Sequence, residues 1–199
     1  MGQQNICEVE NIRLSDCHTL FYIDKRVTNN SIIQLSEIIK KHKKLLFLIF
    51  SRHHNLDDNS MKLLSESLKE NTSIKYLLLY DNETNFMKYL NESLKYNTSI
   101  TDLIFGVKIG INSMKYLNEL LKYNTSINKL HFRCKINSNE IKYLSEILKD
   151  NTIITDIILN DKSETSLMQR FNKLLEDNKN MAIFKQECEN NKSNDSYWK

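Results

Sequence analysis

Histidine and cysteine are the residues of this sequence that could bind a metal or act as nucleophiles, but their spacing favours neither role. His131 and Cys134 lie three residues apart without further ligands beside them, whereas a structural zinc site takes four. The adjacent His53 and His54 would point apart on a strand or a turn. No serine, histidine and acid stand in a recognisable catalytic motif. We therefore expect a protein that is not an enzyme and that uses no metal and no cofactor.

Composition narrows the class of protein further. The 199 residues carry a formal net charge of +3, with lysines and acids interspersed, which does not favour nucleic-acid binding. Three glycines and no proline argue against glycine-rich phosphate loops and proline-rich segments. The four cysteines show no CxxC spacing, which indicates reduced thiols. No stretch approaches the ~20 apolar residues of a membrane span. A cytoplasmic protein is the expectation.

An internal repeat organises the chain. The fragments KENTSI, KYNTSI, KYNTSI and KDNTII place Asn71, Asn97, Asn124 and Asn151 in equivalent positions, 26 or 27 residues apart. Asn178 falls 27 residues further on. We expect this asparagine just past the last turn of a helix, in the left-handed conformation that asparagine adopts second only to glycine.

Two apolar patterns flank each repeated asparagine. Seven and three residues before it lie apolar side chains such as Leu64 and Leu68, a spacing that puts them on one face of a helix. Three, six and eight residues after it lie apolar side chains such as Ile74, Leu77 and Leu79, and the final step of two indicates a strand. Each unit is therefore a helix, a tight corner, a short strand and a loop. Strands that recur in one direction after each helix must form a parallel sheet.

The combined pattern LxxLxxxLKxNTSIxxLxLxxN resembles the ribonuclease-inhibitor-like class of leucine-rich repeats. It reads MKLLSESLKENTSIKYLLLYDN from Met61 to Asn82, and the resemblance covers residues 9–184. The resemblance implies an α/β fold, a right-handed solenoid with parallel strands on the concave face and helices on the convex face. Members of the family mostly bind other proteins, often on the concave face. The family places Asn or Cys at the ninth strand position, and Lys108 is one of several departures from that rule.

The domain organisation follows from the repeat. We expect a leucine-rich-repeat solenoid over residues 1–184 and a flexible polar tail over 185–199. The solenoid would begin with a strand at 9–14. Six helix–strand units are expected at 28–50, 59–79, 85–105, 112–132, 138–159 and 164–184. In the last of these, Met181 and Phe184 would begin the strand.

Residues between the core leucines of each strand are expected on the concave surface. Ile49, Leu78 and Ile104 would be neighbours there, flanked by aromatic residues, and the strand after them is basic. An exposed apolar patch with tyrosines is typical of a protein-binding surface, and the basic residues would attract an acidic part of the partner. The predicted partner-binding residues are Phe47, Ile49, Tyr76, Leu78, Tyr80, Ile104, Lys129, His131 and Arg133.

Other interpretations of this surface stay open. Ile and Leu favour strands whatever they contact, and the same face would also serve self-association. Our first hypothesis is a non-enzymatic module that binds a protein, of unknown identity, on its concave face, with no small-molecule substrate. The second is a regulator of a partner enzyme, either an inhibitor or a GTPase-activating-like protein. Nucleic-acid binding ranks third, because aromatic and basic residues are not interleaved on one face.

Overall fold

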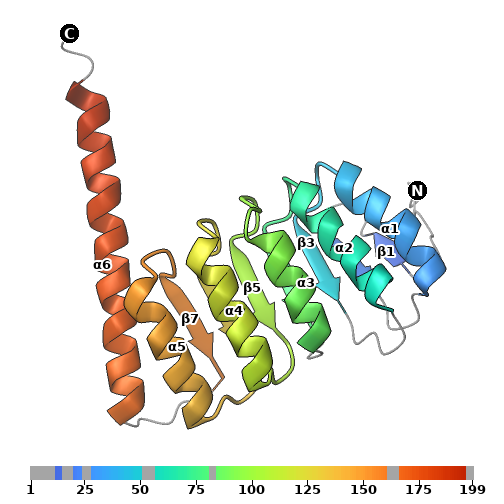
Figure 1. Ribbon diagram of the computed structural model, residues 1–199. Helices are drawn as coiled ribbons and strands as arrows, with labels where there is room; N and C mark the ends of the chain where they lie inside the picture. The colour runs from blue at the N-terminus through green and yellow to red at the C-terminus, as the bar shows by residue number, and fades with distance from the viewer. Residues whose placement is uncertain are drawn as a thin grey trace, which may run out of the picture.

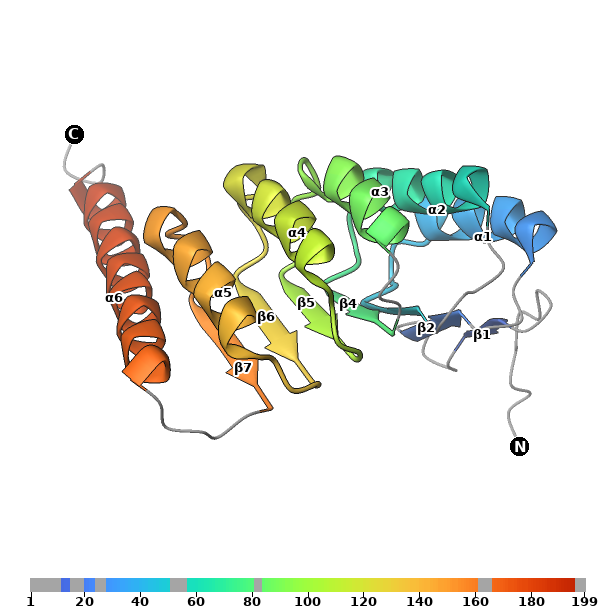
Figure 2. The ribbon, with the colours of Figure 1, turned by 60° about the horizontal axis from the view of Figure 1, so that its bottom comes forward.

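The computed structural model describes residues 12–14, 20–23, 28–50, 57–80, 84–160 and 166–195, which form a sheet and a layer of helices (Figure 1). The strands are β1 (Ile12–Leu14), β2 (Leu20–Ile23), β3 (Phe47–Phe50), β4 (Tyr76–Leu79), β5 (Asp102–Phe105), β6 (Lys129–Phe132) and β7 (Asp156–Leu159). The helices are α1 (Asn29–Lys41), α2 (Asp58–Glu70), α3 (Thr84–Leu94), α4 (Ile111–Tyr123), α5 (Ser138–Asp150) and α6 (Ser166–Asp195). Figure 2 shows α1 to α5 in one layer on one side of the strands.

The strands lie in chain order from β1 to β7 in a single sheet of the described residues. β2 to β7 are parallel, so the predicted alternation of helices and parallel strands is confirmed. The N-terminal end differs from the prediction, because Ile12–Leu14 pairs antiparallel with β2 and only β2 begins the parallel series. β2 was not predicted, since the segment before it carries no repeated asparagine. Residues 9–11, His53 and His54 lie outside the described residues.

The core lies between the sheet and the helices, where the two apolar patterns of each unit meet. Leu64 and Leu68 of α2 and Leu77 and Leu79 of β4 are all fully buried. Phenylalanines fill the space at the strand ends, as where the rings of Phe105 and Phe132 stack with centroids 5.0 Å apart. Because each unit buries its apolar residues against its neighbours, the core runs continuously from unit to unit.

The repeated asparagines join each unit to the one before it. Asn97 Nδ2 donates to the carbonyl oxygens of Leu68 at 2.7 Å and Asn71 at 3.1 Å, both in the preceding unit. Asn97 Oδ1 accepts from the backbone N–H groups of Ser99 at 3.0 Å and Ile100 at 2.9 Å, in its own corner. The Asn97 side chain is buried, so these bonds satisfy backbone groups that water does not reach.

The left-handed conformation expected at these asparagines is wrong. The backbone is extended at Asn71, with φ −76° and ψ 132°, and nearly the same at Asn124, with φ −74° and ψ 130°. The side chain itself makes the turn, because its Oδ1 accepts from the N–H groups two and three residues further on. Asparagine is therefore used here for its amide group and not for its tolerance of positive φ.

Helix α6 is a further correction. Met181 and Phe184 do not begin a strand, and residues 185–195 are not a flexible tail, because all of them belong to the 30-residue helix Ser166–Asp195. The strand pattern fails at its third apolar position, where Gln186 stands in place of Leu or Phe. A strand there would place an unpaired amide in the core, whereas a helix satisfies its own backbone. Figure 1 shows α6 extending well past the sheet.

Candidate protein-binding surface

One face of the sheet points away from the helices, and we call it the open face. Side chains alternate along a strand, so Phe47 and Ile49 lie on the open face while Leu48 between them is in the core. The register of β3 to β7 aligns the open-face residues in two rows. The first row is Phe47, Tyr76, Asp102, Lys129 and Asp156, and the second row is Ile49, Leu78, Ile104, His131 and Ile158. Of the nine predicted site residues, seven lie in these rows, and Tyr80 and Arg133 directly follow β4 and β6.

An aromatic pair forms the apolar end of the first row. The rings of Phe47 and Tyr76 are stacked, with centroids 4.3 Å apart and planes 9° from parallel. Phe47 is 37% exposed and Tyr76 is half-buried. Rigid aromatic surface that is already ordered gives large contact area at low entropic cost, which is typical of binding anchors.

The second row is less exposed than the sequence suggested. Leu78 is only 8% exposed, because it lies between Ile49 and Ile104 in the row, and those two side chains are half-buried. Its contribution to a contact is therefore smaller than predicted. Ile158 at the other end of the row is 47% exposed and was not among the predicted site residues, although it occupies the same strand position.

Charges of opposite sign alternate at the β5–β7 end of the first row. Lys129 stands between Asp102 and Asp156 in the strand register. The Asp102 carboxylate also accepts a hydrogen bond from Thr101 Oγ1 at 2.6 Å. Lys129 is exposed and both aspartates are half-buried, so this end of the face carries both signs of charge, whereas the prediction emphasised its basic residues. The two aspartates were visible in the sequence at the same strand position.

Tyr80 spans three strands at the edge of the open face. Its ring passes over Gly106, which follows β5, and its hydroxyl oxygen lies 3.4 Å from an Arg133 guanidinium nitrogen, which donates to it. Arg133 is exposed, and its backbone carbonyl accepts from Asn160 Nδ2 at 3.0 Å. The tyrosine hydroxyl therefore offers this exposed arginine one long hydrogen bond at the edge of the face. Gly106 gave no signal in the sequence that it makes room for a ring.

His131 is the titratable group at the centre of the face. Burial lowers the pKa of His131 from its usual 6.5, and the nearby positive charge of Arg133 lowers this pKa further. The Asp156 carboxylate acts in the opposite direction. His131 is therefore neutral at pH 7, and the positive charge of the face comes from Lys129 and Arg133.

Neither a metal site nor a membrane-spanning helix is found among the residues that the structure describes. Among them, no group of three or more His, Cys, Asp or Glu side chains is arranged to hold a metal ion. No helix in the described ranges is long and apolar enough to cross a membrane.

Comparison with solved structures identifies a related fold. The C-terminal domain of tropomodulin from Caenorhabditis elegans is 12% identical in sequence, with a TM-score of 0.54, and the match covers 78% of this chain and 97% of that one. This chain shares its fold. The fold is leucine-rich-repeat-like, with helices alternating with the strands of a parallel sheet. Leiomodin-1 actin-binding site 2 is 16% identical with a TM-score of 0.47, over 88% of this chain and 89% of that one. No family model matches the sequence, and neither does any curated protein.

Proposed function

We propose that this protein is a non-enzymatic interaction module that binds a partner protein on the open face of its sheet. The observation that carries the proposal is the stacked pair of Phe47 and Tyr76, which is partly exposed at the apolar end of the first row and is followed in that row by charged residues. A surface with aromatic anchors, a partly buried apolar centre and charged ends has the composition of a protein interface.

The architecture supports the same use of this face. We propose that the units wind as a right-handed solenoid of the ribonuclease-inhibitor-like class, because strand–helix–strand connections in parallel sheets are almost always right-handed. The open face would then be the concave face. In this proposal the protein works in the cytoplasm, has no cofactor and contacts its partner with Phe47, Ile49, Tyr76, Tyr80, Ile104, Lys129 and Arg133.

The partner's complementary surface would be apolar and carry both signs of charge. Phe47 and Tyr76 would contact apolar side chains, and Lys129 and Arg133 would pair with carboxylates. Asp102 and Asp156 favour a lysine or arginine of the partner beside those carboxylates. A purely acidic polymer such as a nucleic acid fits this face poorly, because its phosphates would meet the two aspartates.

A pair of double variants tests the proposal by affinity capture from the host cytosol. Phe47→Ser/Tyr76→Ser removes the aromatic pair, and Ile33→Ser/Tyr96→Ser removes two exposed apolar residues from the helical layer. Circular dichroism checks that both variants are folded. We expect the affinity for the captured protein to fall about thirtyfold in the first variant and to stay unchanged in the second. Equal capture by both variants would contradict binding at the open face.

The second candidate function, regulation of a partner enzyme, rests on Arg133. This exposed guanidinium lies beside the Tyr80 hydroxyl at the edge of the face, where it could reach into a partner's active site. If the captured partner is an enzyme, its turnover should change on binding, and Arg133→Ala should remove that change while leaving capture largely intact. Unchanged turnover would leave the plain binding module as the function.

A further inference from the structure

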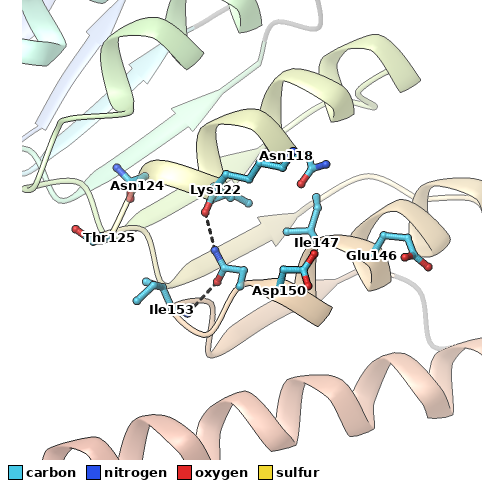
Figure 3. Close-up of a pocket in the computed structure, with 10 residues that line it drawn as sticks. Asn118, Lys122, Asn124, Thr125, Glu146, Ile147, Asp150 and Ile153 are labelled. Carbon is cyan, nitrogen blue, oxygen red and sulfur yellow. Dashed lines mark hydrogen bonds between the residues drawn. The ribbon is translucent and has the colours of Figure 1, made fainter.

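A cleft of about 400 Å³ opens between the C-terminal ends of α4 and α5, away from the open face (Figure 3). Its apolar part is Leu121, Ile147 and Ile153, and its polar part includes the Asn124 and Asn151 corners and the Asp150 carboxyl group. Figure 3 shows Asp150 beside Ile147 on the α5 side and Lys122 on the α4 side. The volume is that of a small-ligand site.

The repeated asparagines Asn71, Asn97, Asn124 and Asn151 each bond to the preceding unit, and we call this series of hydrogen bonds the asparagine ladder. The cleft coincides with a gap in the asparagine ladder. At the preceding corner, the Asn97 carbonyl accepts from Asn124 Nδ2 at 2.9 Å and from Ser126 Oγ at 3.0 Å. The Asn71 carbonyl accepts the same two kinds of bond, from the next asparagine and the next serine, each at 3.1 Å.

At the Asn124 corner both donors are missing. The serine is replaced by Ile153, which has no hydroxyl group. The next asparagine, Asn151, is present, but its Nδ2 donates only to the Leu121 carbonyl, at 2.8 Å, and not to the Asn124 carbonyl. No donor among the described residues reaches the Asn124 carbonyl oxygen, which belongs to a residue that lines the cleft. A peptide carbonyl at this depth needs a hydrogen-bond donor.

Side-chain contacts that join the first three pairs of neighbouring units are also missing here. A lysine stands two residues before His42 and before each of Asn71, Asn97, Asn124 and Asn151, and three of these five lysines contact the next unit. Lys40 pairs with Glu70 at 3.4 Å, and Lys95 pairs with Glu119 at 3.7 Å. Lys69 lies over the Tyr96 ring.

Lys122 holds the same position in α4 but makes no such contact. Its counterparts on α5 are Glu146 and Asp150, and no ion pair joins Lys122 to either within the described ranges. Glu146 is bound instead to Lys149 of its own helix at 2.7 Å, which lowers the pKa of the Glu146 carboxyl. Asp150 and Lys122 are both exposed, and neither has an ion-pair partner among the described residues, so the cleft carries one unpaired carboxylate beside one unpaired ammonium group.

We propose that this cleft binds an aliphatic ammonium group, as carried by a lysine side chain of a peptide or by a free polyamine. The ammonium would donate to the Asn124 carbonyl and to the Asp150 carboxylate, for neither of which a partner is found among the described residues. Its methylene chain would lie on Leu121, Ile147 and Ile153. The three charged side chains that line the cleft, Lys122, Glu146 and Asp150, sum to one negative charge, which favours a cationic ligand over an anionic one. This site is independent of the proposed function, because it lies between helices and not on the open face.

The test is an NMR titration of the ¹⁵N-labelled full chain with two probes. One probe is 1,5-diaminopentane, and the other is Nα-acetyl-lysine methylamide, so that a free amine and a peptide-borne lysine are compared. We expect signals of Thr125, Ile153 and the Asn151 side-chain amide to shift in a saturable way with at least one probe. Tighter binding of the diamine would identify a polyamine site, and tighter binding of the lysine derivative would identify a peptide site.

Two variants and one control decide whether the shifts report this cleft. Asp150→Asn removes the free carboxylate, and Ile153→Ser supplies the hydroxyl that would bond to the Asn124 carbonyl, as Ser126 does one unit earlier. We expect each to weaken binding about tenfold. Asp156→Asn on the open face makes the same chemical change elsewhere and should leave binding unchanged. An absence of saturable shifts at the three reporters, or equal weakening by Asp150→Asn and Asp156→Asn, would overturn the proposal.

Discussion

The ring of Tyr80 lies across Gly106, so that a Cβ atom on Gly106 would stand 3.0 Å from Tyr80 Cγ and would overlap Cδ1 and Cε1. Only glycine leaves room for the ring in this position. Because the ring crosses β5 here, its hydroxyl group reaches the guanidinium of Arg133 beyond β6. One small residue thus decides whether the Tyr80 hydroxyl can reach an exposed cation of the open face.

Substitution of Gly106 should therefore act through Tyr80. We expect Gly106→Ala to push the ring aside and to lower the free energy of unfolding by about 1–2 kcal/mol, measured by urea denaturation. The double variant Gly106→Ala/Tyr80→Ala removes the overlap and should not be less stable than Tyr80→Ala alone. Gly110→Ala is the comparison, because its added Cβ meets no atom within 4 Å and its cost is only that of an alanine at the N-cap of α4. Additive losses in the double variant would show that the overlap has no effect.

The asparagine ladder should be among the most sensitive parts of the fold. Asn97→Ala removes two bonds to the preceding unit and leaves the N–H groups of Ser99 and Ile100 without their acceptor. We expect a loss of roughly 3–5 kcal/mol in the free energy of unfolding, because several backbone groups become unsatisfied together. Asn139→Ala, at an exposed position of α5, should change stability by less than about 1 kcal/mol. Similar losses for the two variants would contradict the role of the ladder.

The helical state of residues 179–195 makes a definite prediction for Phe184, and the buried Phe171 of the same helix provides the comparison. If the repeat continued, Phe184 would occupy the buried strand position that Leu77 has in its unit; in α6 it is 62% exposed. We expect Phe184→Ala to change the free energy of unfolding by less than about 0.5 kcal/mol. Phe171→Ala, in the buried part of the same helix, should cost about 3–5 kcal/mol. A large loss from Phe184→Ala would favour the strand.

Stability should also depend on pH through His131. Its pKa is lowered in the folded protein, so the folded state binds a proton less readily than the unfolded state does. This contribution to stability is fully present above the usual pKa of 6.5 and is lost as the pH falls below it. The comparison is urea unfolding of wild type and His131→Gln between pH 8 and pH 5, in which the variant should lose less stability on acidification. A parallel decline would show that His131 does not contribute.

The repeat made most of the architecture predictable from sequence, because apolar spacing reports directly on buried faces. Leu64 and Leu68 follow the helical spacing, and Leu77 and Leu79 follow the strand spacing, since each must reach the core. The backbone at Asn71 was predicted wrongly, because propensity alone does not show that its side chain bonds to the preceding unit.

The site was only partly predictable. The strand register is a consequence of the repeat, so the rows of the open face could be listed in advance. The stacking of Phe47 on Tyr76, the burial of Leu78 and the path of Tyr80 over Gly106 depend on side-chain rotamers and on neighbours across strands, which a single sequence does not show.

Site-specific photo-crosslinking is the most direct test of binding at the open face. A benzophenone amino acid would replace Phe47 in one sample and Tyr96, on the helical layer, in another, followed by irradiation in the host cytosol. Both residues are aromatic and exposed, so the two probes differ mainly in the face they sample. The account predicts a discrete adduct with one protein from position 47 and none with that protein from position 96. The same adduct from position 96, with none from position 47, would contradict the account.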